Sequence, residues 1–271
     1  MIRALYTAAS GMTAQQLNVD TISNNMANVN TAAYKKETTN FKSLLYTTMG
    51  EANDPNAATA PTVKQVGHGV RALANSRDYS RGILQETGNE SDLAIVGDGF
   101  FAIQEPDGSE VYTRDGSFRF AMIPDDGTYA LVTSDGRPVL STEGESIIID
   151  VGTPVEELQI GQDGNVFYLD ETDVQMDIAQ IRVVQFANKA GLEAIGSNLY
   201  RQTPASGEPM AEADEDGLSK SIIRTGYLEG SNVQIAEEMV NLIIAQRAYE
   251  INSTAIKTAD DMLGQANQLK S

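Results

Sequence analysis

The chain lacks several residue types on which common protein functions depend. Among its 271 residues there is no cysteine, no tryptophan and one histidine. Without cysteine there can be no disulfide and no thiolate metal site. No apolar run approaches the roughly 20 residues of a membrane-spanning helix. Thr7, Ser10 and Gly11 also break the apolar core that a secretory signal needs, so we expect no cleaved signal peptide.

Charge is unevenly distributed along the chain. The formal net charge is −19, but residues 1–50 carry four basic and two acidic side chains, and residues 232–271 carry three basic and five acidic ones. The middle of the chain therefore holds essentially all of the negative charge. Such a middle repels nucleic acid and anionic lipid, so neither is an expected partner. The nearly neutral ends suit burial against other protein.

Residues 231–269 carry the strongest pattern in the sequence. They contain no proline, and Gly264 is their only glycine. Apolar residues recur every 3.6 positions, the period of a straight α-helix, and Ser231 with Gln234 fits a capping box at its start. This apolar stripe comprises Val233, Ala236, Val240, Ile244, Ala248, Ile251, Ala255, Ala259, Met262, Ala266 and Leu269. A helix of about 57 Å is too long for a compact domain to cover, so the stripe needs another partner.

A second seam lies beside that stripe and has a counterpart at the other end of the chain. Leu242, Tyr249, Ile256 and Leu263 repeat every seven residues, and so do Leu5, Met12, Val19 and Met26 in a predicted helix over residues 2–29. We expect the two helices to pair as a coiled coil through these seams. The opposite face of the first helix is uncharged and rich in amides, at Gln15, Gln16, Asn18, Asn24, Asn25 and Asn28. Both helices thus have surface left for other copies of the chain.

The pattern between the two helices is that of a β domain. Short runs rich in branched and aromatic residues alternate with Asp-Gly pairs, which suit hairpin turns. The expected strands are Leu93–Val96, Phe100–Gln104, Val111–Thr113, Phe118–Phe120, Tyr129–Thr133, Ile147–Val151, Val166–Leu169 and Ile181–Phe186. Outside this region, Val66–Leu73 and Leu84–Thr87 are expected as short strands, and residues 53–61 as a flexible loop.

The predicted fold class is α+β, with an antiparallel all-β central body inserted between N- and C-terminal helices that pair as a coiled coil. We expect three parts. Residues 1–34 with 229–271 form the helical domain, residues 35–90 with 201–228 an extended connector, and residues 91–200 the antiparallel β domain.

Three motifs resemble chemical sites but favour structural interpretations. Gly97–Ala102 matches the letters of a dinucleotide-binding loop, yet a strand follows where a helix N-terminus is needed. Glu212–Gly217 resembles the start of a calcium loop, but Ile223 stands where a bidentate glutamate is required. His68 has no serine elbow or cysteine to act with and is expected in a turn. We therefore expect no enzyme and no catalytic residue, cofactor or metal.

Motifs at both ends and in the middle resemble those of the flagellar rod and hook proteins. At the N-terminus these are Asn24–Thr31, Tyr34–Lys35 and Phe41; at the C-terminus they are Ser231–Val233, Glu237–Val240 and Gln246–Glu250. In the middle they are Leu93–Ile95, Gly97, Gly99–Phe101 and Tyr112–Gly116. One departure is Ala33, because the family usually has glycine before the aromatic residue; if this position needs a positive φ, alanine is strained there.

The resemblance implies a structural subunit of an axial flagellar tube. It implies export by the flagellar type III apparatus without a cleaved signal, and a place in the basal body outside the cytoplasm. It also implies terminal helices that order on assembly. The expected partners are copies of the chain, neighbouring rod and hook proteins, bushing ring proteins and the export apparatus, with no small-molecule substrate. The expected self-assembly interface is Leu5, Met12, Val19, Met26, Asn25, Asn28, Leu242, Tyr249, Ile256 and Leu263.

Two alternatives remain open at this point. The first is another axial family member, either a different rod protein or a short hook protein. The second, of another class, is a carbohydrate-binding or hydrolytic surface protein built on the β body. It would need a concave site lined with aromatic and acidic side chains.

Overall fold

The computed structural model describes residues 2–48, 65–123, 127–149, 158–169, 174–213 and 217–268. The chain groups into two units. The helical unit comprises Met1–Ala27, Glu37–Asp78 and Gln234–Ser271, and the β unit comprises Asn28–Lys36 and Tyr79–Val233. Of the residues that the sequence suggested as a connector, 37–78 fall in the helical unit, and 35–36, 79–90 and 201–228 fall in the β unit.

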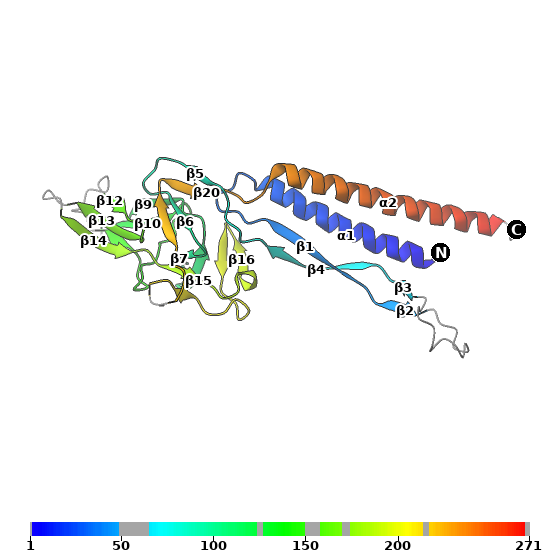
Figure 1. Cartoon of the computed structure of the whole chain (residues 1–271), viewed down its shortest axis with the longest axis horizontal. Helices are drawn as coiled ribbons and strands as arrows, with labels where there is room; N and C mark the ends of the chain where they lie inside the picture. Colours follow the sequence, from blue (N-terminus) through cyan, green and yellow to red (C-terminus); the bar gives the residue numbers. More distant parts are fainter. Residues whose placement is uncertain are drawn as a thin grey trace. The chain divides into compact units, whose positions relative to one another are not determined.

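Two long helices dominate the helical unit. α1 (Ile2–Ala27) and α2 (Ile235–Gln268) run antiparallel and pack against each other (Figure 1). α2 begins four residues later than the capping box at Ser231 predicts. The Ser231 hydroxyl accepts a bond from the Val233 N–H, and the Asn232 amide bonds to Ser80, so residues 231–233 are held outside the helix. No helix in the described part of the chain combines the length and apolarity needed to span a membrane.

A two-stranded ribbon completes the helical unit. β1 (Glu37–Ser43) pairs antiparallel with β4 (Val70–Arg77), and β2 (Tyr46–Thr48) pairs with β3 (Gln65–Gly67). Val66–Leu73, predicted as a single strand, is instead divided between β3 and β4, because the backbone leaves the strand conformation at Gly69. Its φ is +106°, and a Cβ there would lie 2.1 Å from Ser10 Oγ of α1. The loop predicted at residues 53–61 lies outside the described residues.

The β unit is built from antiparallel pairs, as expected. Its six-stranded sheet has the order β16 (Glu193–Gly196), β17 (Leu199–Arg201), β8 (Glu110–Thr113), β7 (Phe100–Gln104), β15 (Val183–Gln185) and β18 (Met210–Ala211). Two three-stranded sheets are β11 (Ile148–Ile149), β10 (Tyr129–Thr133), β9 (Phe118–Met122), and β12 (Leu158–Ile160), β13 (Asn165–Leu169), β14 (Gln175–Gln180). Two pairs remain: β6 (Leu93–Val96) with β19 (Ile222–Thr225), and β5 (Leu84–Glu86) with β20 (Tyr227–Glu229). One 3₁₀ turn, η2 (Lys189–Gly191), lies among them.

β7 lies at the centre of the core of the β unit. Side chains alternate across a strand, and β7 is buried on both faces. Phe101 therefore packs into one apolar cluster with Leu93 and Phe118, while Phe100 packs into a second with Tyr200. The sequence predicted this strand correctly from its aromatic and branched residues Phe100, Phe101 and Ile103.

Most differences from the predicted strands have a local cause. The run Ile181–Phe186 yields only β15, because Ile181 makes one isolated bridge to Ser141 and does not join the strand. β14 was not predicted because glutamines and an aspartate interrupt its apolar pattern. The run Ile147–Val151 yields only β11, and residues 150–157 lie outside the described part.

Candidate assembly surfaces and a buried polar network

The two helices approach closely through small residues. Ala8 and Ala14 of α1 and Ala245 and Ala259 of α2 are all buried. The seam residues of both helices lie at heptad spacing around them. All of them are half-buried except Tyr249, which is exposed; the others are Leu5, Met12, Val19, Met26, Leu242, Ile256 and Leu263. Their spacing and burial fit the packing of α1 on α2, and whether these eight positions also mediate self-assembly stays a prediction.

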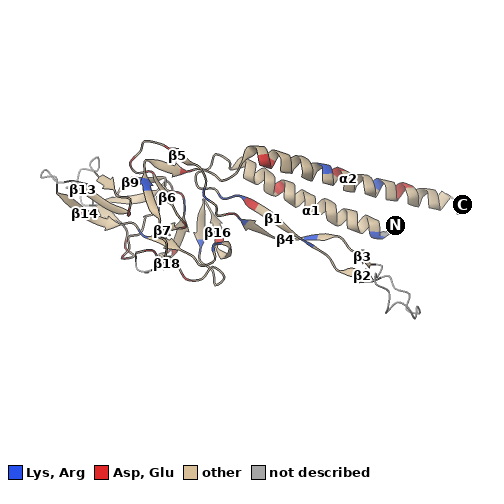
Figure 2. Cartoon of the chain, viewed as in Figure 1, with Lys and Arg blue, Asp and Glu red and all other residues tan. Residues whose placement is uncertain are grey.

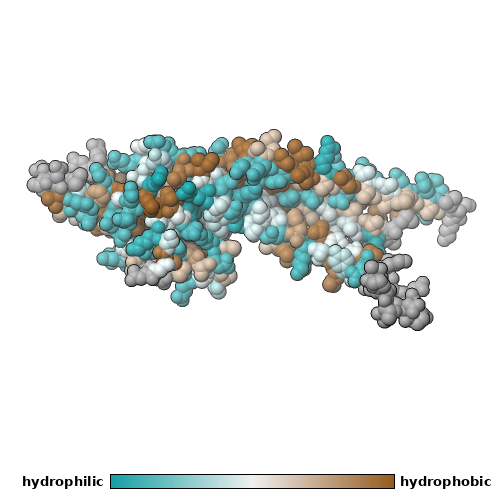
Figure 3. Space-filling view, in the orientation of Figure 1, coloured by the Kyte–Doolittle hydropathy of each residue, from teal (hydrophilic) through white to brown (hydrophobic). Residues whose placement is uncertain are grey.

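The large residues in the 3.6-residue stripe of α2 face elsewhere, although Ala259 of the same stripe is buried. Val240 is 56% exposed, Ile244 61% and Ile251 69%, although all three are large and apolar. Viewed down the helix axis, at 100° per residue, these three positions point within about 40° of one another and about 100° or more away from Ala245. We call the exposed residues Val240, Ile244, Ile251 and Met262 the α2 band. Figure 3 shows apolar side chains gathered along the first half of α2, and Figure 2 shows few charges on either helix.

Two asparagines predicted to mediate assembly are engaged within the chain. Asn25 is 1% exposed, and its amide exchanges two bonds with the backbone of Glu37, at 2.8 and 2.9 Å. It also donates to a carboxylate oxygen of Glu238 at 3.2 Å. Asn28 accepts a bond from the Thr31 hydroxyl at 3.2 Å. Asn25 therefore fixes the start of β1 against α1, and whether either residue also contacts other copies stays a prediction.

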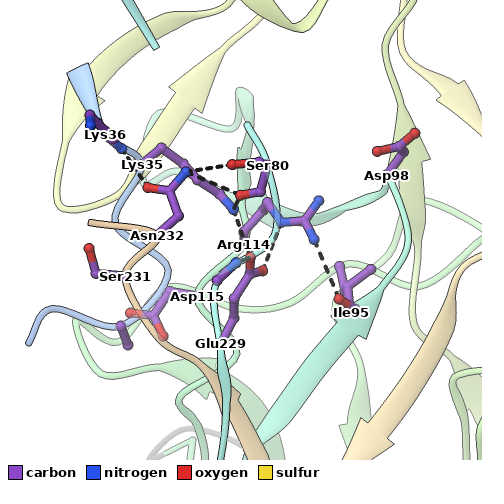
Figure 4. A network of polar contacts seen from close by, with 12 residues as sticks. Lys35, Lys36, Ser80, Ile95, Asp98, Arg114, Asp115, Glu229, Ser231 and Asn232 are labelled. Carbon is purple, nitrogen blue, oxygen red and sulfur yellow. Dashed lines mark hydrogen bonds and ion pairs between the residues drawn. The ribbon is translucent and has the colours of Figure 1, made fainter. Parts of the chain in front are cut away.

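A buried ion network lies inside the β unit (Figure 4). The Glu229 carboxylate is fully buried and accepts bonds from Lys35 Nζ at 2.7 Å, Arg114 Nε at 2.9 Å and the Gly82 N–H at 3.0 Å. Gly82 must be glycine, because a Cβ there would lie 1.9 Å from the Gly230 carbonyl oxygen. Glu229 thus joins three segments that are far apart in the sequence.

The cations of this network are satisfied by backbone carbonyls as well. Arg114 donates to the carbonyl oxygens of Gly97 at 3.0 Å and Gly99 at 3.1 Å, and its guanidinium lies 5.6 Å from the centre of the Phe100 ring. Lys35 Nζ donates to the Ser80 carbonyl oxygen at 2.8 Å. The segment Gly97–Ala102 that resembled a nucleotide loop therefore leads into β7 and binds an arginine through its carbonyl oxygens.

The neighbouring backbone is tied in the same way. The Asn232 side chain accepts a bond from the Lys36 N–H at 2.7 Å and donates to the Ser80 carbonyl oxygen at 3.2 Å. The Ala33 N–H donates to the Glu229 carbonyl oxygen at 2.7 Å. Together, Lys35, Lys36, Ser80, Gly82, Arg114, Glu229 and Asn232 form what we call the collar.

Electrostatics in the collar favour the ionised carboxylate. Burial by itself would raise the pKa of Glu229, but the charges of Arg114 and Lys35 and the bond from Lys35 outweigh it, so the pKa is lowered. Glu229 is therefore an anion at neutral pH. The core of the collar thus holds two cations and one anion, and the Asp98 carboxylate also interacts with the charge of Arg114.

Two cavities of the β unit lack the aromatic lining of a sugar site. A polar cavity of about 370 Å³ is lined by residues that include Arg182, Glu212 and Lys220, and none of its lining residues is aromatic. A second, of about 380 Å³, is lined by Gln104, Glu105, Arg137 and glycine or proline residues. Within the described ranges, no group of three or more histidines or carboxylates is placed to hold a metal.

His68 contacts a threonine, and the acidic loop is described only in part. His68 lies between β3 and β4, and its Nε2 lies 2.6 Å from Thr47 Oγ1. Residues 214–216 of the suggested calcium loop lie outside the described part.

Comparison with known families gives the same three regions that the sequence motifs indicated. Residues 5–35 match the model described as "Flagella basal body rod protein", residues 94–168 that of the "Flagellar hook protein FlgE/F/G D1 domain", and residues 224–269 that of the "Flagellar basal body rod FlgEFG protein C-terminal". A "Flagellar basal-body rod protein FlgG" of Borreliella burgdorferi is 46% identical over 274 residues, covering 100% of this chain and 99% of that protein. This chain belongs to the flagellar basal-body rod protein family.

Other relatives of this rod family match over their full length too. The protein of the same name from Bacillus subtilis is 39% identical over 271 residues, covering 100% of both chains. The "Flagellar hook-basal body complex protein FlhP" of the same organism is 32% identical over 276 residues, again covering 100% of both. A solved hook protein, FlgE2 of Helicobacter pylori, is 15% identical with a TM-score of 0.24 over 64% of this chain and 48% of that one. That score is too low to indicate a shared arrangement.

The collar is the part of this site that the sequence did not single out. Lys35 and Arg114 stand within motifs that carried the family resemblance, but nothing in the sequence paired them with Glu229. The available signal was a charged residue next to buried apolar neighbours, as Arg114 follows the buried Val111–Thr113. Such a residue must find a buried partner, but its identity requires the fold.

Proposed function

We propose that this chain is the subunit of the distal section of the flagellar rod. It assembles into a helical tube that transmits torque from the motor to the hook. Full-length similarity to rod proteins named FlgG supports this proposal over a hook protein. FlhP, a hook-basal body protein, is less similar at 32%.

The observation that carries the assembly proposal is the α2 band. Fully burying an aliphatic side chain is worth about 1.5–3 kcal/mol, and contiguous exposed apolar surface commonly marks a protein contact. Val240, Ile244 and Ile251 are more than half exposed although α2 already packs on α1. A second copy of the chain can cover them, and repetition of one such heterologous contact extends a helical assembly without closing it.

The packing of α1 on α2 has the features of a coiled coil. Positions 242, 249, 256 and 263 alternate with 238, 245, 252 and 259 in the three-four spacing of a heptad seam. Ala245 and Ala259 are buried between them. We propose that this pairing presents α2 as a rigid element, with its band free for the next subunit. The heptad residues then hold α2 against α1 on a face of α2 away from the band. Asn25 and Asn28 contribute near the C-terminal end of α1.

The remaining parts of the proposal follow from charge and family. The acidic β unit suits a solvated outer surface that faces the bushing rings, because its negative charge opposes nonspecific association between copies. Export by the flagellar type III apparatus places the chain in the envelope outside the cytoplasm. The role is mechanical, so we propose no catalytic activity. The carbohydrate alternative is weakened because neither cavity described above is lined by an aromatic side chain.

The assembly proposal is tested by adding one charge to the α2 band. Ile244→Asp places a carboxylate where the neighbouring copy would bury it, whereas Gln246→Asp adds the same charge two residues away, at another exposed position. We expect Ile244→Asp to retain the far-ultraviolet circular dichroism of the parent but to abolish rod assembly and motility. Gln246→Asp should affect both far less. Normal rods with Ile244→Asp would contradict the proposal.

The position in the rod requires a separate experiment. Deletion of the gene should stop assembly after the proximal rod, so that basal bodies lack the distal section and the hook. If such cells still build a complete rod but no hook, the chain is a hook component instead.

A further inference from the structure

Three of the four crossings of the chain between the two units lie within two residues of a collar residue in the sequence. The boundaries fall after residues 27, 36, 78 and 233. Three short segments of the β unit therefore lie at its connections to the helical unit: residues 28–36 after α1, residues 79–82 after β4, and residues 229–233 before α2. Each of these segments contributes at least one collar residue.

The bonds of the collar run between these segments more than within them. Glu229 accepts from Lys35 of the first segment and from Gly82 of the second. Asn232 accepts from Lys36 and donates to Ser80, so the third segment is bonded twice to each of the others. Lys35 of the first segment donates to Ser80 of the second. Because each segment bonds to both of the others, none can move away without breaking bonds to the other two.

Breaking these bonds is costly because Lys35, Arg114 and Glu229 are charged and shielded from water. The side chains of Lys35 and Glu229 are 0% exposed and that of Arg114 is 1% exposed. A buried ion pair adds little net stability over apolar residues, but removal of one partner strands the other charge. Such a network is therefore better suited to fixing one arrangement of the chain than to raising its stability.

We propose that the collar couples the N-terminal and C-terminal passages of the chain, so that they order and release together. Loosening of residues 229–233 takes the Glu229 carboxylate away from Lys35 and so loosens residues 28–36, and loosening of residues 28–36 takes Lys35 away from Glu229 and so loosens residues 229–233. α1 precedes residues 28–36, and α2 follows residues 229–233. Each helix is then presented only when both of these passages are ordered. This coupling rests on the β unit alone and does not depend on the rod assignment.

Hydrogen exchange of the full chain, read by segment, tests the coupling. Glu229→Gln removes the counterion and should speed exchange about a hundredfold in residues 28–36 and 79–82 as well as in 229–233, since breaking a buried pair is that costly. Exchange in β7 and β8 should rise far less. Asp135→Asn is the matched control, since Asp135 pairs with Arg137 on the surface of the same unit.

A second substitution makes the test specific for charge. Lys35→Met in the Glu229→Gln background removes the stranded cation and should restore slow exchange in part, so the two changes are not additive. If Glu229→Gln does not fold, Lys35→Met alone is read instead. It leaves Arg114 paired with Glu229 and should still speed exchange in residues 79–82 and 229–233. Acceleration confined to the mutated segment, equal acceleration in β7, or strict additivity would each overturn the coupling.

Discussion

Gly11 of α1 lies against Asn252 of α2 so closely that a Cβ on Gly11 would be 2.8 Å from the Asn252 amide nitrogen. Glycine within a helix is usually about 0.5–1 kcal/mol less favourable than alanine. Here the missing side chain lets the helices approach, because Asn252 occupies the space that a methyl group would need.

Gly11→Ala should therefore fail to give the usual stabilisation. We expect helix melting, followed by circular dichroism at 222 nm, to stay near that of the parent or to fall. Adding Asn252→Ala makes room, and the double variant should then gain about 0.5–1 kcal/mol relative to Asn252→Ala alone. A full gain from Gly11→Ala by itself would show that the two helices are not held at this distance.

Ala33 has a left-handed backbone conformation, with φ at 55°, and is 1% exposed. This is the geometry for which the family's usual glycine is suited, so the strain anticipated from the sequence is present. A β-branched residue tolerates this region far less than alanine does. We expect Ala33→Val to lower the free energy of unfolding by about 2 kcal/mol or more in urea titrations.

Ala33→Gly is the matched variant for that position. It relieves about 1 kcal/mol of strain but loses a buried methyl group of similar value, so its stability should stay within about 1 kcal/mol of the parent. If both variants cost the same, lost packing rather than backbone geometry governs the site.

Glu229 makes the β unit sensitive to acid. Its pKa in the folded protein lies below the usual value of 4.5, because Arg114 and Lys35 outweigh the effect of burial. The stability that it contributes is present above pH 4.5 and is lost as pH falls through the folded pKa. The melting temperature of the parent should therefore drop below about pH 4.5, and Glu229→Gln should lack that part of the drop. An unchanged pH profile in the variant would contradict this account.

Asp115 has the opposite dependence on pH. Burial raises its pKa above 3.8, and its bonds with Ser117 do not offset this. Holding the charged form costs stability above the folded pKa, and the cost disappears as pH falls below about 3.8. Asp115→Asn keeps an oxygen for the Ser117 N–H, which donates to Oδ1 at 3.0 Å. It should raise the melting temperature at pH 7 and show no advantage at pH 3; equal effects at both would refute the charge explanation.

The sequence predicted those parts of the fold that depend on local periodicity. The stripe and the heptad seam of α2 were separable in the sequence because spacings of 3.6 and 3.5 residues drift apart along a long helix. The structure places the large residues of the stripe on a different face from the seam, with the α2 band exposed and Leu242 and Ile256 half-buried. The α+β class and the antiparallel body also followed from pattern, and the Asp-Gly pairs identified turns.

The remaining features depend on contacts between distant residues. The Ser231 capping box failed because Asn232, next to it, is held by Ser80 and Lys36. Gly116 stands in an Asp-Gly pair like the others, yet it is needed for close approach, since a Cβ would lie 1.8 Å from the Leu93 carbonyl oxygen. Neither contact can be recognised from the local sequence. The same holds for the partners of Glu229.

The central claim is that the α2 band is open in the free chain and covered by another copy in the rod. Since the chain has no cysteine, Ile244→Cys provides a single thiol on that band. Its rate of reaction with a maleimide should be that of an exposed thiol in the free chain and should fall at least about tenfold in assembled rods. Equal reactivity in the free chain and in rods would contradict the account.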